Sequence, residues 1–517
     1  MRGESGVRAT RREWIGLAVI ALPCMLYSMD LTVFDLAVPR LSADLRPTGT
    51  ELLWILDIYG FLVAGSLITM GTLGDRIGRR RLLLIGAGTF GAASVLAAFS
   101  TSVPMLIAAR ALLGVAGATL APSTLSLIRS MFRDAEQRTV AIGVWVTSYS
   151  VGAAIGPLCG GIVLEHFRWG AVLLLGVPVM LLLLVTGPIL LPEYRDDEAG
   201  RLDLTSAAQS LVAILLVIYG LKRMAEYGPS AFGLAAIVGG AGVGAAFVRR
   251  QHGLADPLID LDLFRAPAFS VALATYAVGT FVGFAMYLFL AQYLQLVLGL
   301  PPLRAGLATV PSMLMFIAGS ALVPRLARRA RPASAIAGGL LVSAIGFAVL
   351  ARAGTPSLSW LIAGSVIYSA GLTPVVILAT DLIVGSAPVE RAGAAAAISE
   401  TGSELGGSLG IALLGSLATA LYRRSMAAWM PADTSPEIGR AARGTLGGAI
   451  DVAKGLTLPQ GRELVGAARA AFEQAFQVTA LVCAALALLA AAGTVLVLRE
   501  RGGRERERAE KLVVQVG

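Results

Sequence analysis

Charged side chains interrupt several long apolar runs of this chain, and their types and spacing could do chemistry. Glu400 and Glu404 lie in the run AAAAISETGSELGGSLG, and a spacing of four places them one turn apart on one helix face. Two carboxylates this close cannot both ionise cheaply in a low dielectric, so their protonation is coupled. Such a pair can hold a proton or meet a cation. Snorkelling to a surface or capping a helix end are the structural alternatives.

Asp30, Asp57 and Arg110 interrupt three other apolar runs. An ionisable side chain inside a membrane costs at least about 2.5 kcal/mol on insertion scales, so each is a functional candidate. A nearby guanidinium favours an ionised carboxylate, whereas desolvation favours the protonated form, and an arriving cation can tip this balance. Exchange of a cation for a proton requires this chemistry. Arg110 could instead bond a backbone carbonyl, and Asp57 could lie near the membrane interface.

Three aromatic side chains accompany these charges in spans that are otherwise poor in aromatics: Trp54, Trp145 and Tyr149. Aromatic faces attract lipophilic cations, so these residues are candidates for substrate binding. Packing in the protein core is the alternative for each of them. Asp381 stands far along its run, and we expect it to reach the inner membrane surface.

The elements that carry these residues are membrane spans. The chain has 517 residues, of which 56% are hydrophobic and 15% charged, with a mean hydropathy of +0.76. Soluble domains carry roughly 25% charge, and a helix of about 20 apolar residues crosses the hydrocarbon layer. We therefore predict an all-α integral membrane protein of the cell membrane, with fourteen spans at approximately 14–39, 51–73, 82–100, 104–128, 139–164, 169–191, 205–224, 230–248, 269–298, 304–324, 333–352, 357–384, 393–421 and 476–498.

The distribution of basic residues orients these spans. Most Lys and Arg residues fall in the alternate connections that share a side with the N-terminus, which predicts cytoplasmic N- and C-termini and a cytoplasmic tail at 499–517. At 1.5 Å per residue, Asp30 lies about 24 Å from the inner start of its span. Asp57 and Arg110 lie about 9 Å below the outer starts of theirs, so all three share a similar depth in the outer half.

The sequence gives little support to nucleic acid binding, ATP hydrolysis or enzymatic catalysis. The net charge of +9 belongs to short loops and so does not indicate nucleic acid binding. No lysine follows glycine and precedes Ser or Thr, which argues against a phosphate-binding loop and ATP hydrolysis. The scattered cysteines and two histidines predict no metal site, no catalytic site and no cofactor other than the proton as coupling ion. Gly406–Gly410 matches a nucleophile elbow by chance, and we interpret its glycines as helix-packing residues.

An internal repeat is visible in two Arg-rich turns. The loop GTLGDRIGRRR follows the second span, and VPRLARRARP at 323–332 follows the tenth. This predicts two six-helix halves, 1–191 and 269–498, separated by two inserted spans within 205–248. The long outer segment 422–475 is expected to form a helical hairpin with its break at Gly455–Pro459.

Two glycine-rich segments predict close helix contacts. In the Arg-rich turn after the second span, small residues let the two helices approach closely. Asp75 can accept hydrogen bonds there from an arginine or from a helix N-terminus. Orientation by positive charge alone would explain its arginines but not its glycines or its aspartate. The residues of this candidate conformational switch are Gly71, Gly74, Asp75, Arg76, Gly78 and Arg79. The second segment has glycines at spacing four and a proline that invites a kink: Gly152, Gly156, Pro157, Gly160 and Gly161.

These motifs carry a family resemblance over essentially the whole chain. The Arg-rich turn resembles the signature loop of the major facilitator superfamily. LIAARALLGVAG at 106–117 resembles its fourth-span motif, and VGAAIGPLCGG at 151–161 resembles the fifth-span motif of antiporters. MDLTVFDLAVP at 29–39, with LLWILDIYG at 52–60, resembles the fourteen-span drug:proton antiporter branch and its exporters of quaternary ammonium compounds. Asp35 departs from that pattern, which usually has asparagine there.

The resemblance implies roles for the charged residues. Asp30 would bind the proton and Arg110 would tune it, with Asp57 also assigned to proton coupling. Glu400 and Glu404 would meet cationic substrates, and Ser399 stands where some relatives have a further acid. The fifth-span glycines would serve conformational coupling.

We therefore expect a major facilitator fold that exports lipophilic cationic drugs, such as quaternary ammonium compounds, dyes and biguanides, in exchange for protons. Alternating access would operate on a cavity lined by spans 1, 2, 4, 5, 9, 10 and 13. The alternatives are a transporter of another solute class, such as a siderophore, lipid, sugar or organic acid, and a membrane receptor that transports nothing.

Overall fold

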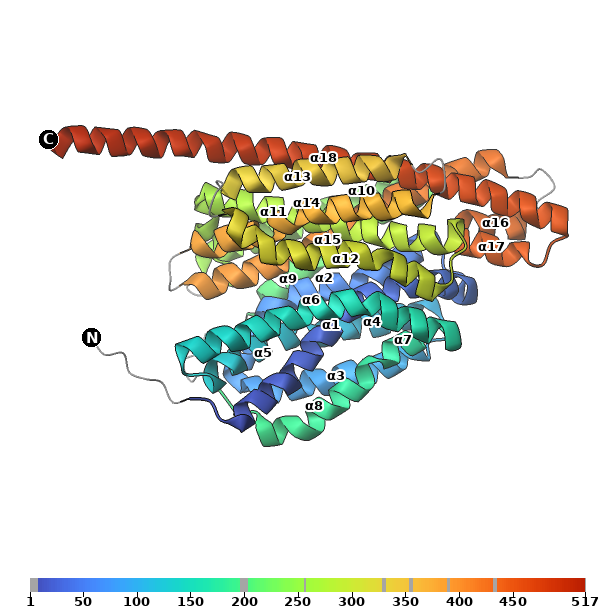
Figure 1. The fold of residues 1–517 in the computed structure, drawn as a ribbon. Coiled ribbons are helices and arrows are strands. Elements are labelled where there is room, and N and C mark those ends of the chain that lie inside the picture. Colours follow the sequence, from blue (N-terminus) through green and yellow to red (C-terminus); the bar gives the residue numbers. More distant parts are fainter. Residues whose placement is uncertain are drawn as a thin grey trace. The chain divides into compact units, whose positions relative to one another are not determined.

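The structure, a computed structural model, describes residues 8–195, 203–254, 257–327, 332–352, 357–387, 391–430 and 435–516. In these ranges every regular element is a helix (Figure 1). Fourteen segments there are long and apolar enough to cross a membrane, which confirms the expected number of spans. The elements are α1 (Arg11–Leu45), α2 (Gly49–Ile77), α3 (Arg79–Ala98), α4 (Val103–Gly117), α5 (Leu120–Met131), α6 (Ala135–His166), α7 (Ala171–Leu174), α8 (Gly176–Leu190), α9 (Leu204–Tyr227), α10 (Ala231–Gly253), η1 (Leu261–Arg265), α11 (Pro267–Gln292), η2 (Tyr293–Val297), α12 (Pro302–Ala327), α13 (Pro332–Ala351), α14 (Leu358–Gly385), α15 (Ala392–Trp429), α16 (Pro436–Gly444), α17 (Leu446–Ala453) and α18 (Leu458–Val516).

Two of the expected spans are interrupted. The fourth is divided between α4 and α5, and the sixth between α7 and α8. In both cases a proline stands four residues after the point of interruption: Pro122 has no N–H for the carbonyl of Ala118, and Pro178 has none for Leu174. The missing backbone hydrogen bond weakens each helix at this point and favours a break, although it does not impose one, since α6 continues through Pro157.

The helices cluster into two compact units. Unit 1 contains residues 1–258, 288–310 and 411–475, and unit 2 contains residues 259–287, 311–410 and 476–517. The inserted helices α9 and α10 belong to unit 1. The division into two six-helix halves stays a prediction, and much of the second Arg-rich turn, 328–331, lies outside the described residues.

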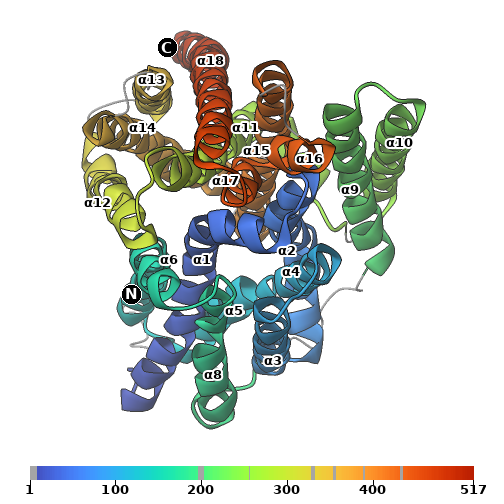
Figure 2. The same cartoon turned by 90° about the vertical axis from the view of Figure 1, so that its right-hand side faces the viewer.

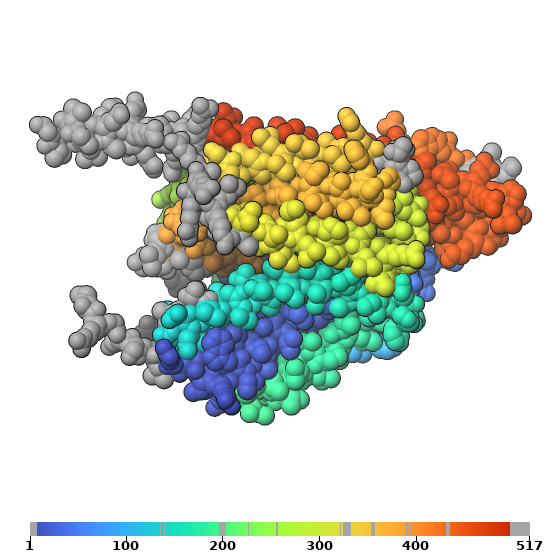
Figure 3. All heavy atoms as spheres, viewed as in Figure 1, coloured from blue at the N-terminus to red at the C-terminus, as the bar shows by residue number. Residues whose placement is uncertain are grey.

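In unit 1 the glycines of α6 bring it against α1. A methyl group added to Gly152 would meet the backbone carbonyl of Met25, and one added to Gly160 would meet Val33. On another side of α1 lies α8, and the two helices are neighbours on the face drawn in Figure 3. The spacing of four therefore produces the flat packing face that the sequence predicts.

The inserted helices pack on each other, and α9 packs on α2 (Figure 2). Gly220 of α9 lies against the backbone of Gly233 on α10, and Gly65 of α2 lies against Leu211 of α9. At one end of the pair, Arg250 bonds to Asp203 at 3.1 Å. Hydrogen bonds from Arg250, followed by those from Ser206, lower the pKa of Asp203 to about 2.

Unit 2 repeats the same kind of packing between α15 and α11. Gly406 lies against the backbone of Ala277, and Gly410 lies against that of Phe281. These contacts confirm that the glycines of the apparent nucleophile elbow are packing residues. A second close pair joins α13 to α14, where Gly346 meets the backbone of Tyr368.

The segment 422–475, which we expected to form an outer helical hairpin, contains more than two helices. Its expected break is present, because α17 ends at Ala453 and α18 begins at Leu458. Before that break, however, the chain forms the end of α15 followed by α16 and α17. Ser435 and Thr445 each accept a hydrogen bond from the first turn of the next helix, so two separate N-caps divide this arm.

We predict that Gly152→Ala destabilises the protein, because the added methyl group meets main-chain atoms of α1 that cannot rotate away. Overpacking of this kind costs about 1–3 kcal/mol. The measurement is the thermal unfolding midpoint of purified protein in detergent.

Gly143→Ala is the matched control, since it lies on the same helix with open space around the new methyl group. Alanine there should leave the midpoint unchanged or raise it. Equal midpoints for the two variants would contradict the packing argument.

Candidate functional site

The first candidate centre is a buried ion pair between α1 and α4. Arg110 Nη1 lies 3.0 Å from Asp30 Oδ2, and the two side chains are 3% and 12% exposed. Arg110 Nε also donates to the carbonyl of Ile55 at 3.3 Å. Both partners that the sequence offered Arg110, a carboxylate and a backbone carbonyl, are therefore present together.

Two aromatic rings fix the guanidinium of Arg110 in this position. Its central carbon lies 4.2 Å from the ring centre of Phe34 and 4.7 Å from that of Tyr59. Close packing allows this geometry, because Gly114 of α4 lies against the backbone of Tyr59 on α2. The arginine thus has two aromatic neighbours in addition to its carboxylate and carbonyl partners.

Asp35 lies further along α1 and is 7% exposed. It interacts electrostatically with both Arg110 and Asp30. The residue that departs from the family pattern therefore adds a second carboxylate to the neighbourhood of the same arginine.

Asp57 does not join this centre through an ion pair with Arg110. Its Oδ2 lies 2.6 Å from Lys222 Nζ on α9, and neither side chain is more than 1% exposed. The same ammonium lies 3.9 Å from the ring centre of Trp54. Asp57 is thus fully enclosed by the protein. A substrate contact on this face of Trp54 would need Lys222 to leave the ring.

Sequence reasoning missed Lys222 as a partner. The three lysines entered the argument mainly to exclude a phosphate-binding loop. A usable signal was present, because Lys222 falls inside the seventh apolar span and is the only lysine within any expected span. The rule applied to the buried acids would have marked Lys222 as a functional candidate, but not which acid it pairs with.

Trp145 and Tyr149 belong to an aromatic cluster in unit 1. Their rings are 4.9 Å apart, and Tyr149 lies 6.0 Å from Tyr27, whose ring is 6.2 Å from that of Tyr59. Trp145 Nε1 donates to Thr124 at 2.9 Å. The cluster extends from α6 to the aromatic face that supports Arg110, so its rings can pack the core and still offer π faces to a cation.

Glu400 and Glu404 lie one turn apart on α15, within unit 2. Glu404 is 7% exposed, and both carboxylates interact electrostatically with Tyr276 of α11. Glu400 makes neither an ion pair nor a hydrogen bond with any residue that the structure describes. Ser399 beside it is 1% exposed. Glu400 therefore has no basic partner among the described residues, which suits a carboxylate that binds a cation.

The glycine- and arginine-rich turn closes on itself and on the end of α8. Asp75 pairs with Arg79 at 2.5 Å, not with a facing helix. Gly78 has φ +107°, a conformation that favours glycine. Two residues further on, Arg80 pairs with Glu193. The remaining candidate residues of this turn, Gly71, Gly74 and Arg76, lie in the last turns of α2.

The fifth-span motif contacts α12 as well as α1. Gly161 lies against Leu303, and Gly306 lies against the backbone of Pro157, all within unit 1. The helix α6 continues through Pro157 without a break. Asp381, on α14, is exposed on the protein, and its expected place at the inner membrane surface stays a prediction.

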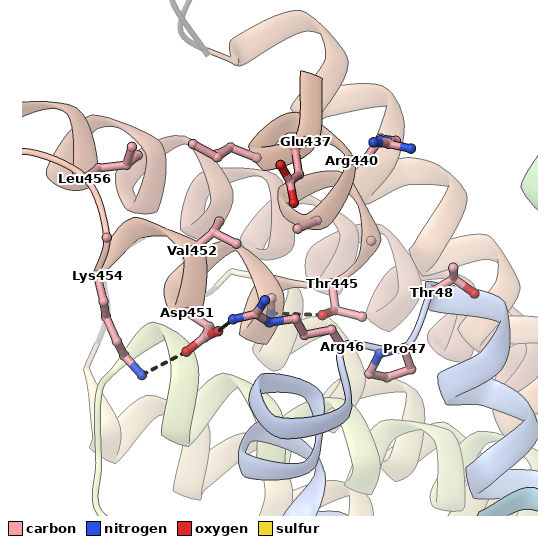
Figure 4. A pocket seen from close by; sticks show the side chains of 15 residues that line it. Arg46, Pro47, Thr48, Glu437, Arg440, Thr445, Asp451, Val452, Lys454 and Leu456 are labelled. Carbon is pink, nitrogen blue, oxygen red and sulfur yellow. Dashed lines mark hydrogen bonds and ion pairs between the residues drawn. The ribbon is translucent and has the colours of Figure 1, made fainter. Parts of the chain in front are cut away.

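A separate pocket of about 660 Å³ lies where the connection from α1 to α2 meets α16 and α17 (Figure 4). Asp451 links its walls, with Arg46 at 2.9 Å and Lys454 at 3.3 Å. Glu437 and Arg440 complete its charged lining. The lining has three bases against two acids, and Asp451 is already paired with two of the bases, so this pocket is poorly suited to a lipophilic cation. None of the predicted site residues line it.

Comparisons with known proteins cover nearly the whole chain. It is 43% identical to the multidrug efflux pump LfrA of Mycolicibacterium smegmatis over 94% of this chain and 97% of that protein. It is 38% identical to the methyl viologen resistance protein SmvA of Salmonella typhimurium over 93% and 97% of the two chains.

The fold has solved counterparts. A bacterial homolog of the human lysosomal transporter Spinster, crystallised in an inward-facing and unoccupied conformation, matches with a TM-score of 0.66 at 18% identity over 94% of this chain and 98% of that one. The model of the Major Facilitator Superfamily matches residues 20–411. This chain is therefore a multi-pass membrane protein that belongs to the major facilitator superfamily.

Proposed function

We propose that this protein is a proton-coupled antiporter that exports lipophilic cationic drugs by alternating access. Its fourteen spans would lie in the cell membrane with both termini in the cytoplasm, as the basic loops predict. The names of the two relatives, a multidrug efflux pump and a methyl viologen resistance protein, support drug export as the function.

The single observation that carries proton coupling is the environment of Asp30. Its ion-pair partner Arg110 is held by Phe34, Tyr59 and the carbonyl of Ile55, independently of Asp30. Asp30 can therefore gain a proton and release the ion pair without leaving Arg110 unsupported. A carboxylate that changes charge beside a fixed cation is what an exchanger needs.

The cation would be met by Glu400 and Glu404. Methyl viologen, in the name of one relative, is a dication, and two adjacent carboxylates can neutralise two positive centres. The rings of Trp145 and Tyr149 supply aromatic faces of the kind that attract organic cations. Proton and drug would compete for carboxylates, so no nucleotide, metal or other cofactor is needed for coupling.

The turn at Asp75 and the fifth-span glycines would serve the conformational change. Asp75 restrains Arg79, and Arg80 ties the same turn to Glu193 beyond α8. These contacts bind one end of α2 to its neighbours and make no contact with Asp30 or Arg110. They can bias an equilibrium between states without touching the drug.

We predict that Asp30→Asn abolishes drug efflux driven by a pH gradient while the protein stays folded, because an amide keeps the shape of the side chain but cannot carry the proton. The measurement is efflux of a cationic dye from proteoliposomes under an imposed gradient. Asp381→Asn, which removes an exposed acid of α14, serves as the control and should transport normally. Full activity in folded Asp30→Asn protein would refute proton coupling at this residue.

We predict that Asp75→Ala slows the transport cycle with little loss of drug affinity, since Asp75 restrains Arg79 and lines no drug contact. Turnover in proteoliposomes and equilibrium drug binding should be measured on the same preparations. Arg81→Ala removes an exposed arginine of the same turn and should change neither quantity. A large loss of affinity at unchanged turnover would contradict a switching role.

We predict that Glu400→Gln and Glu404→Gln weaken export of divalent biguanides or diamidines more than export of monovalent quaternary amines. A dication can use both carboxylates, and a lost charge-assisted contact costs about 1.5–3 kcal/mol, or roughly tenfold or more in affinity. Efflux of matched compounds should be compared at equal expression.

Glu463→Gln, on the exposed side of α18, is the matched control and should leave both ligand classes unaffected. Asp30→Asn should stop both classes alike. Equal losses for the two classes in the Glu400 and Glu404 variants, or no loss for either, would show that these acids are structural.

A further inference from the structure

Trp54, Asp57 and Lys222 form a group in unit 1 that the proposed transport mechanism does not use. The two ionic side chains are buried and the ring is partly buried. Trp54 and Asp57 lie three residues apart on α2, so both side chains point to a similar side of that helix. Lys222 reaches them from α9, and its ammonium lies 2.6 Å from Asp57 Oδ2 and 3.9 Å from the ring centre of Trp54.

The two residues of α2 have the chemistry of a receptor for an organic ammonium ion. An aromatic face and a carboxylate are the elements with which proteins bind such cations, the face through its quadrupole and the carboxylate through its charge. Both ionic side chains are at most 1% exposed, so water does not compete for the ammonium.

Helix α9, which carries Lys222, packs closely against both α2 and α10. Leu211 of α9 lies against Gly65 of α2, and Gly220, close to Lys222 in the chain, lies against the backbone of α10. The side chain is thus delivered by a helix pair and not by a loop. Its position is built into the packing of unit 1.

We propose that Trp54 and Asp57 form a binding site for a primary alkylammonium ion and that Lys222 is its tethered occupant. In the intact protein the lysine excludes small organic cations from this site. When the lysine side chain is removed, the site accepts a free monovalent alkylammonium. The inference does not rest on the proposed drug export, because it concerns binding and can be tested without transport.

The test is chemical rescue of Lys222→Ala in the purified full-length protein. Alanine keeps the β-carbon, so the missing atoms correspond to n-propylammonium. We expect the substitution to lower the thermal unfolding midpoint and n-propylammonium chloride to restore it by about 2 °C or more relative to sodium chloride at equal ionic strength. The unsubstituted protein should not respond, because its site is filled.

Three controls separate a cation site from a simple cavity. n-Propanol has nearly the same shape without charge and should not rescue Lys222→Ala. The double variants Lys222→Ala/Trp54→Leu and Lys222→Ala/Asp57→Asn each lack one wall of the site and should lose most of the response. Equal rescue by n-propanol, or an equal response in the unsubstituted protein or in the double variants, would overturn the proposal.

A second measurement decides the question if Lys222→Ala protein cannot be purified. Lys222→Met keeps the volume of the side chain but removes its charge. Unfolding midpoints of Trp54→Phe and Trp54→Leu should differ when Lys222 is present, because phenylalanine keeps an aromatic face and leucine does not. That difference should shrink in the Lys222→Met background. A difference of the same size in both backgrounds would show that the ring and the ammonium are not coupled, which refutes the site.

Discussion

The buried ion pair of Asp30 with Arg110 joins α1 to α4, and that of Asp57 with Lys222 joins α2 to α9. In hydrocarbon a charge is tolerated only beside a compensating group. A buried charge left without any compensating group costs about 3–5 kcal/mol. These two pairs therefore specify which helices of unit 1 must be neighbours, including the attachment of the inserted helices.

Close approach of the helices makes such pairs possible. Asp30 and Arg110 meet only because Gly114 lets α4 lie on the backbone of α2 and because the glycines of α6 support α1 from another side. In a membrane the packing of small residues takes the place of the hydrophobic effect between helices. Unit 2 uses the same device where Gly406 and Gly410 of α15 lie on α11, around the segment that carries Glu400 and Glu404.

Hydropathy predicted the fourteen spans, because length and composition determine that feature directly. The estimated depths left both Asp30 and Asp57 open as partners of Arg110, and it was the family resemblance that linked Asp30 to this arginine. The partner of Asp57 could not be read in the same way, because depth along a span does not give the rotation of one helix about another. The pairing depends on where α9 packs, and α9 lies outside the repeat that the motifs define. The break between α4 and α5 was missed, because a mean hydropathy over 20 residues does not register one absent backbone hydrogen bond at Pro122.

The pairing of Asp57 with Lys222 also has a consequence for biogenesis. Ribosomes deliver α2 to the membrane well before α9 has been synthesised, so the nascent protein carries Asp57 through several insertion steps without its counter-ion. Until α9 is inserted, Asp57 must be protonated or remain in contact with water. A chain truncated before α9 would keep Asp57 without its counter-ion. This unpaired acid is a feature by which cellular quality control can tell an unfinished molecule from a complete one.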